Sequence, residues 1–329
     1  MDISVIVTTY NQEDTIARTL DSVLSQQIDA EFEIIIGDDC STDGTEAVCR
    51  RYEALYPDRI TYLRRPSNMG VVANYFDCIA RARGQFLADC AGDDFWTDPH
   101  KLAMEFDVFR ADPSVSLVAT QWECYDEAAG TRYDPAEQCP PGYYPKGSLL
   151  VPVITNSVTV HLCSSLYRRD IILNLHNECP DVCTDPEFSC EDVQILLAMT
   201  DGGTIVVLPQ KTLAYSVGHE SVSHRHSFAD RFDYSRRTLR QSLILQSKFL
   251  PSPSCAERRS IELFNRRTTE YLAAQAFRSG SKDIRNRFRT FIADHNMPLS
   301  AKTHAYLMAM ASLPVWELTR RLRESFDKN

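Results

Sequence analysis

The chain has 329 residues, of which 43% are hydrophobic, enough for one large domain and a smaller second one. Its formal net charge is −10, and the acidic residues 1–218, which carry a net charge of −19, argue against nucleic acid as a partner. The sequence contains no run of about 18 apolar residues, so no transmembrane helix is expected. The N-terminus has the pattern of a strand rather than of a signal peptide. The 11 cysteines are scattered, which favours reduced thiols and a cytoplasmic location.

The first 125 residues alternate short apolar runs with helical patterns, which predicts βαβ units and a largely parallel sheet. Asn11 is expected to cap the first helix, because Ile16, Leu20 and Val23 then fall on one helical face. Strands are predicted at 3–8, 32–37, 60–63, 86–90 and 115–122. Helices are predicted from Asn11, over 45–56 and 71–83, and from Pro99 onward.

The second half of the chain changes character twice. Residues 126–147 are rich in Pro, Gly and Tyr and predict a loop. Strands are then predicted at 158–166, 204–208 and 213–217, with helices near 170–177 and 190–199. Beyond residue 227 the pattern is helical, interrupted at Pro251, Pro253, Gly280 and Pro298. These changes predict an α/β domain over 1–225 and an all-helical domain over 226–329.

Polar residues follow three of the predicted strands. Thr8-Thr9-Tyr10-Asn11 follows the first strand, Asp38 to Thr45 follows the second, and Gly92 to Trp96 follows the strand at 86–90. In an open α/β sheet, ligands bind outside the carboxyl ends of the strands. Neither a G-x-G-x-x-G nor a G-x-x-x-x-G-K-[ST] motif is present, which argues against a dinucleotide-binding Rossmann domain and a P-loop NTPase.

Acidic loops can hold a phosphate only through a bridging cation, because like charges repel. One or two carboxylates and substrate phosphates are the usual partners of Mg²⁺. Asp93 and Asp94 suit that role, although adjacent aspartates are also common in surface turns that precede a helix.

These motifs together resemble those of family 2 glycosyltransferases, which have the GT-A fold. The resemblance covers roughly the first 225 residues, and six motifs occur in the family's order and spacing. It implies an α/β fold with a Rossmann-like, mostly parallel sheet flanked by helices, here with a C-terminal all-helical extension. The matching stretches are 4–11, 38–45, 68–70, 92–102, Glu191-Asp192, and Tyr215 through His219 to Ser223.

The resemblance assigns the nucleotide side of the site. Thr8, Tyr10 and Asp39 would line the base pocket, and a carboxylate such as Asp39 can accept a hydrogen bond from the N3–H of uracil. Asp38 would be a neighbour in the same pocket. The turn from Asn68 to Gly70 would close the nucleotide side.

The resemblance also assigns the metal ligands and the general base. Asp94 would be the direct ligand of Mg²⁺ or Mn²⁺, and Asp93 would reach the metal, the ribose or a bound water. Asp192 is the candidate general base, with Glu191 as the weaker alternative. Taken alone, this acidic pair would be explained as first-turn carboxylates that favour a helix N-terminus.

His219 would bind the metal or a phosphate oxygen, or lie free on a loop. The family usually carries Tyr-Arg-x-His here, whereas this chain has Ser216 in place of the arginine, and Arg225 is a nearby substitute. Trp96 would lie near the donor or acceptor opening or anchor the core, and His161 could border the acceptor site. A zinc site is a less favoured hypothesis for four irregularly spaced residues: His176, Cys179, Cys183 and Cys190.

The implied activity is inverting transfer of a sugar from a nucleoside diphosphate sugar, UDP-linked by preference, to a hydroxyl of a glycan or lipid-linked glycan in surface polysaccharide synthesis. A sugar nucleotidyltransferase would need a Gly-rich basic loop after the first strand, which is absent, and a non-catalytic binding module would not need both acidic pairs. Residues 219–329 carry a net charge of +9 and could contact an anionic membrane surface, or simply form a solvated helical bundle.

Overall fold

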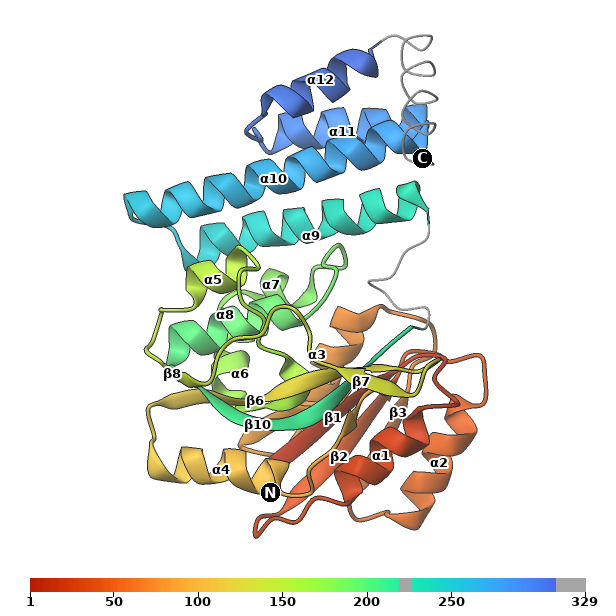
Figure 1. Cartoon of the computed structure of the whole chain (residues 1–329). Coiled ribbons are helices and arrows are strands. Elements are labelled where there is room, and N and C mark those ends of the chain that lie inside the picture. Colours follow the sequence, from red (N-terminus) through yellow and green to blue (C-terminus); the bar gives the residue numbers. More distant parts are fainter. Residues whose placement is uncertain (219–226, 312–329) are drawn as a thin grey trace. The chain divides into compact units, whose positions relative to one another are not determined.

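The computed structural model describes residues 1–218 and 227–311 and divides the chain into two compact units, Met1–His219 and Glu220–Asn329. The first unit is an α/β structure and the second consists of helices in its described part (Figure 1). Among the described residues, no helix is long and apolar enough to span a bilayer.

The first unit is built on one mixed sheet. Its strands are β1 Ile3–Thr9, β2 Phe32–Asp38, β3 Ile60–Arg64, β4 Phe86–Asp89, β5 Phe95–Trp96, β6 Val115–Asp126, β7 Thr131–Tyr133, β8 Gly142–Tyr144, β9 Ser165–Arg168 and β10 Thr204–Val217. Its helices are α1 Ile16–Leu24, α2 Thr45–Leu55, α3 Val71–Arg81, α4 Lys101–Ala111, α5 Leu150–Ile154, the 3-10 turn η1 Leu162–Ser164, α6 Arg169–Glu178, α7 Pro180–Thr184 and α8 Asp192–Gly202.

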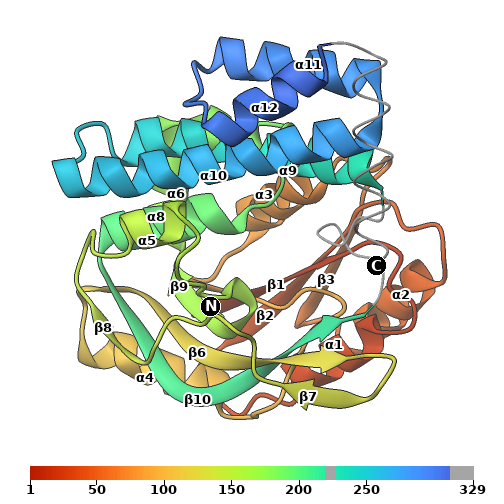
Figure 2. The same cartoon turned by 45° about the horizontal axis from the view of Figure 1, so that its top comes forward.

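The strand order is β3-β2-β1-β4-β9-β6-β10-β5, with β7 and β8 paired to β6 and β10. β1 runs parallel to both β2 and β4, β2 to β3, and β6 to β10, whereas β5, β7, β8 and β9 are antiparallel to their partners. Helices α1, α2 and α4 lie on one side of this sheet and α3, α6 and α8 on the other (Figures 1 and 2). The predicted α/β fold class is confirmed.

The core explains why these segments form strands. Ile3, Val5 and Val7 are fully buried and pack in one cluster with Ile16 and Leu20 of α1. Side chains alternate between the faces of a strand, so Ser4 and Ile6, which are also buried, belong to the other face. Burial on both faces is what the continuous apolar runs predicted.

Several predicted elements were wrong in detail. The loop predicted at 126–147 contains β7 and β8, short and largely exposed strands that carry little apolar signal. The strand predicted at 158–166 is the η1 turn followed by β9, and the two strands predicted within 204–217 are one strand with an irregular register. Asn11 does not cap α1. It has φ of +52°, and its side-chain oxygen accepts from the Thr42 amide at 2.8 Å.

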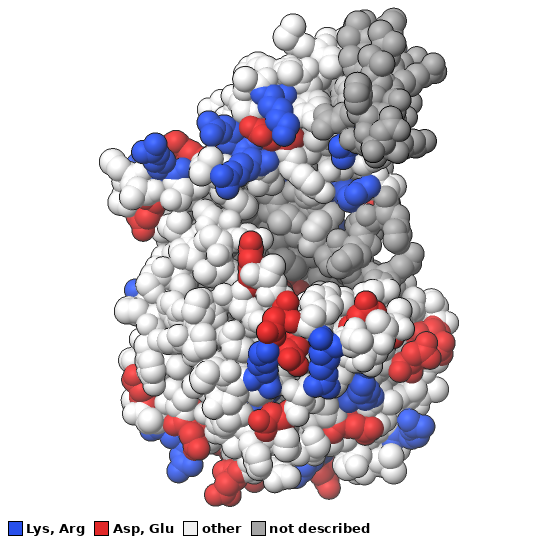
Figure 3. Space-filling model, viewed as in Figure 1, with Lys and Arg blue, Asp and Glu red and all other residues white. Residues whose placement is uncertain are grey.

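The second unit contains α9 Phe228–Phe249, α10 Cys255–Ser279, α11 Lys282–Asp294 and α12 Ala301–Ala309. Each begins after a serine whose hydroxyl accepts a backbone N–H of the first turn, an arrangement that stabilises helix starts. Phe232, Leu239, Leu272 and Phe288 form its fully buried core. Figure 3 shows Lys and Arg side chains gathered on this unit, whereas both signs are interspersed on the α/β unit.

Candidate active site

The carboxyl ends of β1, β2 and β4 bring three polar loops to one edge of the sheet. Thr9 at the end of β1 lies opposite Asp38 at the end of β2, and β4 pairs on the other side of β1. The loops are joined directly: the Asn11 amide donates to Ser41 Oγ at 2.9 Å, and the Gly92 amide donates to the Thr8 carbonyl at 2.9 Å. The sequence predicted this convergence, because the carboxyl ends of parallel strands share one edge of a sheet.

Asp39 is bound to the turn that the sequence predicted as its neighbour. Its Oδ1 accepts from the Met69 amide at 2.7 Å, and its Oδ2 accepts from the Gly70 amide at 2.9 Å. Gly70 has φ of +85°, a conformation that side-chain-bearing residues rarely adopt. The structure therefore brings Asp39, Asn68 and Gly70 together. Thr8, near the end of β1, is partly buried, and the side chain of Tyr10 is 46% exposed.

Asp38 has a different environment from Asp39. Its side chain is fully buried, and it accepts three hydrogen bonds: from the Ser41 amide at 2.8 Å, the Ser41 hydroxyl at 2.6 Å and the Tyr62 hydroxyl at 2.6 Å. These contacts fix the loop that carries Asp39. They favour a supporting role for Asp38 over direct contact with a ligand.

The turn that carries Asp93 and Asp94 is held by one face of α1. Thr15 Oγ1 donates to the Gly92 carbonyl at 2.8 Å, Arg18 Nη2 to the Asp93 carbonyl at 2.9 Å, and Thr19 Oγ1 to the Asp94 carbonyl at 2.6 Å. Three successive backbone carbonyls thus each have a donor from the same helix.

Two further side chains next to these donors bind the segment that follows the turn. Ser22 Oγ accepts from the Trp96 amide at 3.0 Å, and Gln26 Nε2 donates to the Asp98 carbonyl at 2.8 Å. We call the set Thr15, Arg18, Thr19, Ser22 and Gln26 the polar stripe of α1, although Thr15 is the N-cap residue and Gln26 lies just beyond the C-cap. Sequence reasoning missed it, although its spacing of three and four residues is visible once polar positions are read for periodicity.

Asp94 is the least satisfied carboxylate of this edge. Its side chain is 1% exposed, its Oδ1 accepts from the Ser216 amide at 2.9 Å, and its buried Oδ2 has no hydrogen-bond partner. Burial, together with the nearby negative charge of Asp93, raises the pKa of Asp94 well above its ordinary value, and the Ser216 amide and the neighbouring Cys163 thiol partly offset this rise. An unpaired carboxylate oxygen in such a place is costly, and a bound cation would satisfy it. The residues therefore fit a metal ion here.

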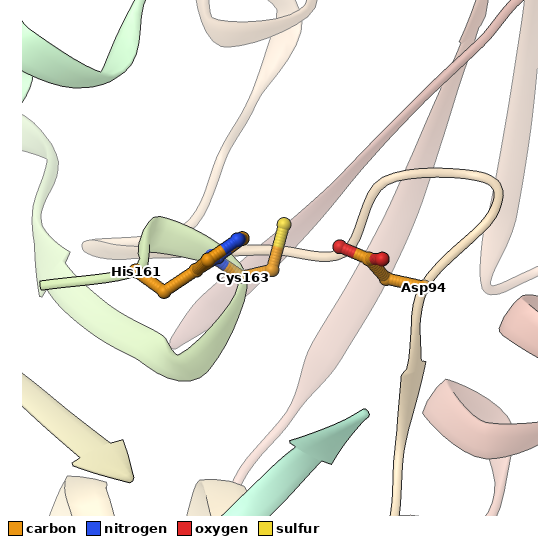
Figure 4. Close-up of side chains that lie close together, drawn as sticks. All are labelled: Asp94, His161 and Cys163. Atoms are coloured by element: carbon orange, nitrogen blue, oxygen red, sulfur yellow. The ribbon is translucent and has the colours of Figure 1, made fainter. Parts of the chain in front are cut away.

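Two other metal-binding side chains lie beside Asp94 (Figure 4). Ligand atoms of Asp94, His161 and Cys163 all lie within 4.8 Å of one another, and among residues 1–218 and 227–311 no other group of three such side chains is this close. The zinc hypothesis for 176–190 therefore has no support in the described part of the chain. Burial lowers the pKa of His161 to about 4, so its ring is neutral at pH 7.

Arg18 occupies the surroundings of Ser216, the residue that replaces the family's arginine. Its Nη2 donates to Ser216 Oγ at 3.2 Å, and Ser216 Oγ donates to the Asp93 carbonyl at 2.6 Å. The guanidinium also pairs with Glu127 and lies 4.2 Å from the centre of the Phe95 ring. His219 and Arg225 lie outside the described residues, so their predicted roles are untested.

Trp96 is a core residue rather than a lining of the opening. It is 4% exposed, its Nε1 donates to the Cys163 carbonyl at 2.8 Å, and the Lys101 ammonium lies 4.4 Å from its ring centre. Trp96 thereby fixes the backbone of Cys163.

Glu191 and Asp192 lie at the start of α8, where both are partly buried. Burial raises the pKa of Asp192 to about 6, and burial together with the Asp192 charge raises the pKa of Glu191 well above its ordinary value. Burial raises the pKa of Asp89, at the end of β4, to about 7, and the Asp192 charge adds to this rise. Asp192 is thus within electrostatic range of the strand that leads to Asp93.

A cavity of about 440 Å³ is found elsewhere, at the amino ends of β6 and β10. Its lining includes Val115, Arg168 and Thr204, and it contains none of the predicted site residues. A single cleft shared by Asp39, Asp94 and Asp192 therefore stays a prediction.

Residues 4–175 match the model of the family described as "Glycosyl transferase family 2". The chain belongs to this family. The expectation of a family 2 glycosyltransferase, drawn from six short motifs, is confirmed.

Relatives agree over shorter stretches. The putative glycosyltransferase EpsE of Bacillus subtilis is 33% identical over 148 residues, 44% of this chain and 52% of that protein. The putative teichuronic acid biosynthesis glycosyltransferase TuaG, also of Bacillus subtilis, is 36% identical over 110 residues, 33% of this chain and 43% of that protein. An uncharacterized protein of Mycobacterium tuberculosis is 40% identical over 114 residues, 35% of this chain and 33% of that protein. The matches thus span a third to a half of these relatives' length.

Solved structures share the fold at low sequence identity. Staphylococcus aureus TarS 1–349 in complex with UDP-GlcNAc aligns with a TM-score of 0.57 and 17% identity, covering 94% of this chain and 91% of that one. The mannosyltransferase PcManGT of Pyrobaculum calidifontis, in complex with GDP-Man and Mn²⁺, aligns with a TM-score of 0.52 and 17% identity, covering 97% and 86%. They confirm the GT-A type of fold.

Proposed function

We propose that this chain is an inverting glycosyltransferase that uses a nucleoside diphosphate sugar and a divalent cation. The observation that carries the proposal is Asp94: a buried carboxylate with one unpartnered oxygen, at the sheet edge where family 2 chains carry their acidic motif. A cation bound there would act as a Lewis acid on the donor diphosphate. Asp93 would contact the ion, the ribose or a bound water.

The nucleotide would lie on the other side of the same edge. Asp39 already accepts from the two amides of the 69–70 turn, and each carboxylate oxygen keeps a second lone pair for the N3–H of a uracil. The pocket would be completed by Thr8, Tyr10, Asn68 and Gly70. Asp38 would hold the loop that carries Asp39. UDP-GlcNAc in the TarS complex supports a UDP-linked donor, and GDP-Man in PcManGT shows that the fold also serves guanine nucleotides.

Asp192 would take the proton from the acceptor hydroxyl as its oxygen attacks the anomeric carbon, with Glu191 as the alternative base. A carboxylate with a pKa of about 6 is ionised at pH 7 and is still a stronger base than an ordinary aspartate. Burial is the main cause of this raised pKa.

The acceptor is proposed from the relatives. The name of TuaG places that protein in teichuronic acid biosynthesis, which supports a surface polymer or a lipid-linked precursor as the acceptor class. We assign catalysis to residues 1–225 and propose that the basic segment 226–329 contacts an anionic membrane or acceptor. The proposed site of action is the cytoplasmic face of the membrane.

The test is release of free UDP from UDP-sugars in the presence of Mn²⁺ and a pool of lipid-linked or polymeric acceptors, with Asp192→Asn as the decisive variant. We expect kcat to fall by about 10²–10⁴-fold. Asp201→Asn is the matched control, because Asp201 lies on the exposed end of the same helix. A fall in kcat of less than about tenfold for Asp192→Asn would exclude a general base of the usual size.

A further inference from the structure

The group formed by Asp94, His161 and Cys163 combines three different kinds of ligand atom. Asp94 comes from the turn after β4, whereas His161 and Cys163 come from the segment that leads into β9. Asp94 and Cys163 are 1% and 8% exposed, and His161 is partly buried. Figure 4 shows the sulfur of Cys163 between the His161 ring and the Asp94 carboxylate. The buried Oδ2 of Asp94 accepts no hydrogen bond and could therefore bind a cation.

We propose that His161 and Cys163 are metal ligands together with Asp94, and that this site binds Zn²⁺ or Co²⁺ more tightly than Mg²⁺. The identity of the ligands extends the proposed function, which requires only that a divalent cation be bound at Asp94. The proposal differs from the ions expected from the acidic motif alone, which are Mg²⁺ or Mn²⁺.

The choice of ion follows from the donor atoms. Mg²⁺ demands octahedral oxygen ligands, whereas thiolate and imidazole select softer transition ions such as Zn²⁺ and Co²⁺. Ligands bound at about 2.0–2.3 Å in a tetrahedral site lie roughly 3.5 Å apart. Atoms already within 4.8 Å of one another can reach that spacing by small side-chain rotations. Three protein ligands also leave one position for a fourth ligand, as in catalytic zinc sites.

The surrounding contacts hold two of the ligands in place before an ion binds. The Cys163 backbone is fixed by Trp96 Nε1, and the Ala91 amide donates to its sulfur at 3.4 Å. The His161 ring packs against Trp122 and Tyr215, with ring centres 5.1 Å and 4.8 Å away. Ligands with locked side chains lose little freedom on binding. Binding of the ion would displace the Cys163 thiol proton to solvent, leaving thiolate as the ligand.

Cobalt titration of the full-length protein tests the ligand set without any turnover. Co²⁺ bound to a thiolate gives a near-ultraviolet sulfur-to-metal charge-transfer band, which neither Asp nor His produces. We expect wild-type protein to develop this band with one equivalent of Co²⁺ and to lose it when Zn²⁺, but not Mg²⁺, is added in equal amount. Cys163→Ser should abolish the band, and Asp94→Asn and His161→Gln should weaken Co²⁺ binding by at least about tenfold.

Cys49→Ser is the matched control, because Cys49 is a fully buried thiol on α2 that belongs to no such group. It should keep the band, and circular dichroism should show that all four variants are folded. A band that persists in Cys163→Ser, or no band in the wild type, would overturn the proposal. If the protein transfers sugar in a metal-dependent way but shows no band, the proposed function stands and the ligand set is wrong. If the band forms but no donor sugar is transferred, the metal site stands and the proposed function is refuted.

Discussion

The two aspartate pairs at the sheet edge look alike in sequence but have opposite environments. Asp38 ends β2 and Asp39 follows it, and both are buried, whereas Asp93-Asp94 follows β4 and only Asp94 of that pair is buried. The buried Asp38 accepts three hydrogen bonds, whereas the buried Asp94 accepts one and leaves an oxygen unpartnered. Three donors hold Asp38 as a support of its loop, whereas the oxygen of Asp94 that accepts no hydrogen bond leaves a place for a cation.

Replacement of Asp94 should have the largest effect. Asp94→Asn is expected to lower kcat/KM by roughly 10²–10³-fold, the cost of losing a major electrostatic contact in the transition state. Its stability at pH 7 without metal should be equal to or above that of wild type. The raised pKa of Asp94 means that the folded state is disfavoured once the group is ionised, and asparagine removes that penalty. Steady-state kinetics and thermal melts measure both effects, and a variant that is active but unstable would reverse the assignment.

The pH dependence extends the comparison to the third acidic pair, Glu191-Asp192. Because Asp192 must be ionised to accept a proton and burial raises its pKa to about 6, kcat should fall about tenfold per pH unit below that value. The measurement is kcat between pH 5 and 8 at saturating metal and donor. Asp201→Asn should keep the same profile, and a flat profile down to pH 5 would count against Asp192 as the base.

Replacement of Asp38 should lower stability, whereas replacement of Asp94 should not. Asp38→Asn replaces an acceptor oxygen by an NH₂ group that faces donors from Ser41 or Tyr62, so the free energy of unfolding should fall by about 1.5–3 kcal/mol. Urea denaturation measures this loss. If Asp38→Asn were as stable as wild type while losing UDP affinity, Asp38 would be a ligand-binding residue after all.

The smallest effect is expected from the polar stripe of α1. Thr19→Val keeps the shape of the side chain but removes the donor to the Asp94 carbonyl, which should cost about 0.5–1.5 kcal/mol of stability. It should also weaken the apparent affinity for Mn²⁺, since the turn that carries Asp94 is then held less firmly. Ser25→Ala, at the exposed end of α1, is the control that should change neither quantity.

The sequence was informative where local pattern decides structure. Strands β1, β2 and β4 were predicted because both of their faces are buried and their sequences are continuously apolar. The expectation of a parallel sheet placed Asp39 and Asp94 at one edge, and the turn at Gly70 could be assigned to the nucleotide side from the family motif. The short exposed strands β7 and β8 carry no such pattern and were missed.

Other features depend on contacts between distant residues and could not be predicted. Asp94 and Cys163 are 69 positions apart, and no spacing rule joins them. The opposite environments of Asp38 and Asp94 arise from Tyr62 and Ser216, which belong to other strands. The polar stripe of α1 was hidden because only the apolar face of that helix was read for periodicity.

Calorimetric titration of UDP into the protein, with and without Mn²⁺, tests the central claim most directly when wild type, Asp94→Asn and Asp38→Asn are compared. We predict that Mn²⁺ strengthens UDP binding to wild type and to folded Asp38→Asn, and has no effect on Asp94→Asn. Equal enhancement by Mn²⁺ in Asp94→Asn would contradict the account, because the ion that bridges protein and diphosphate would then bind elsewhere.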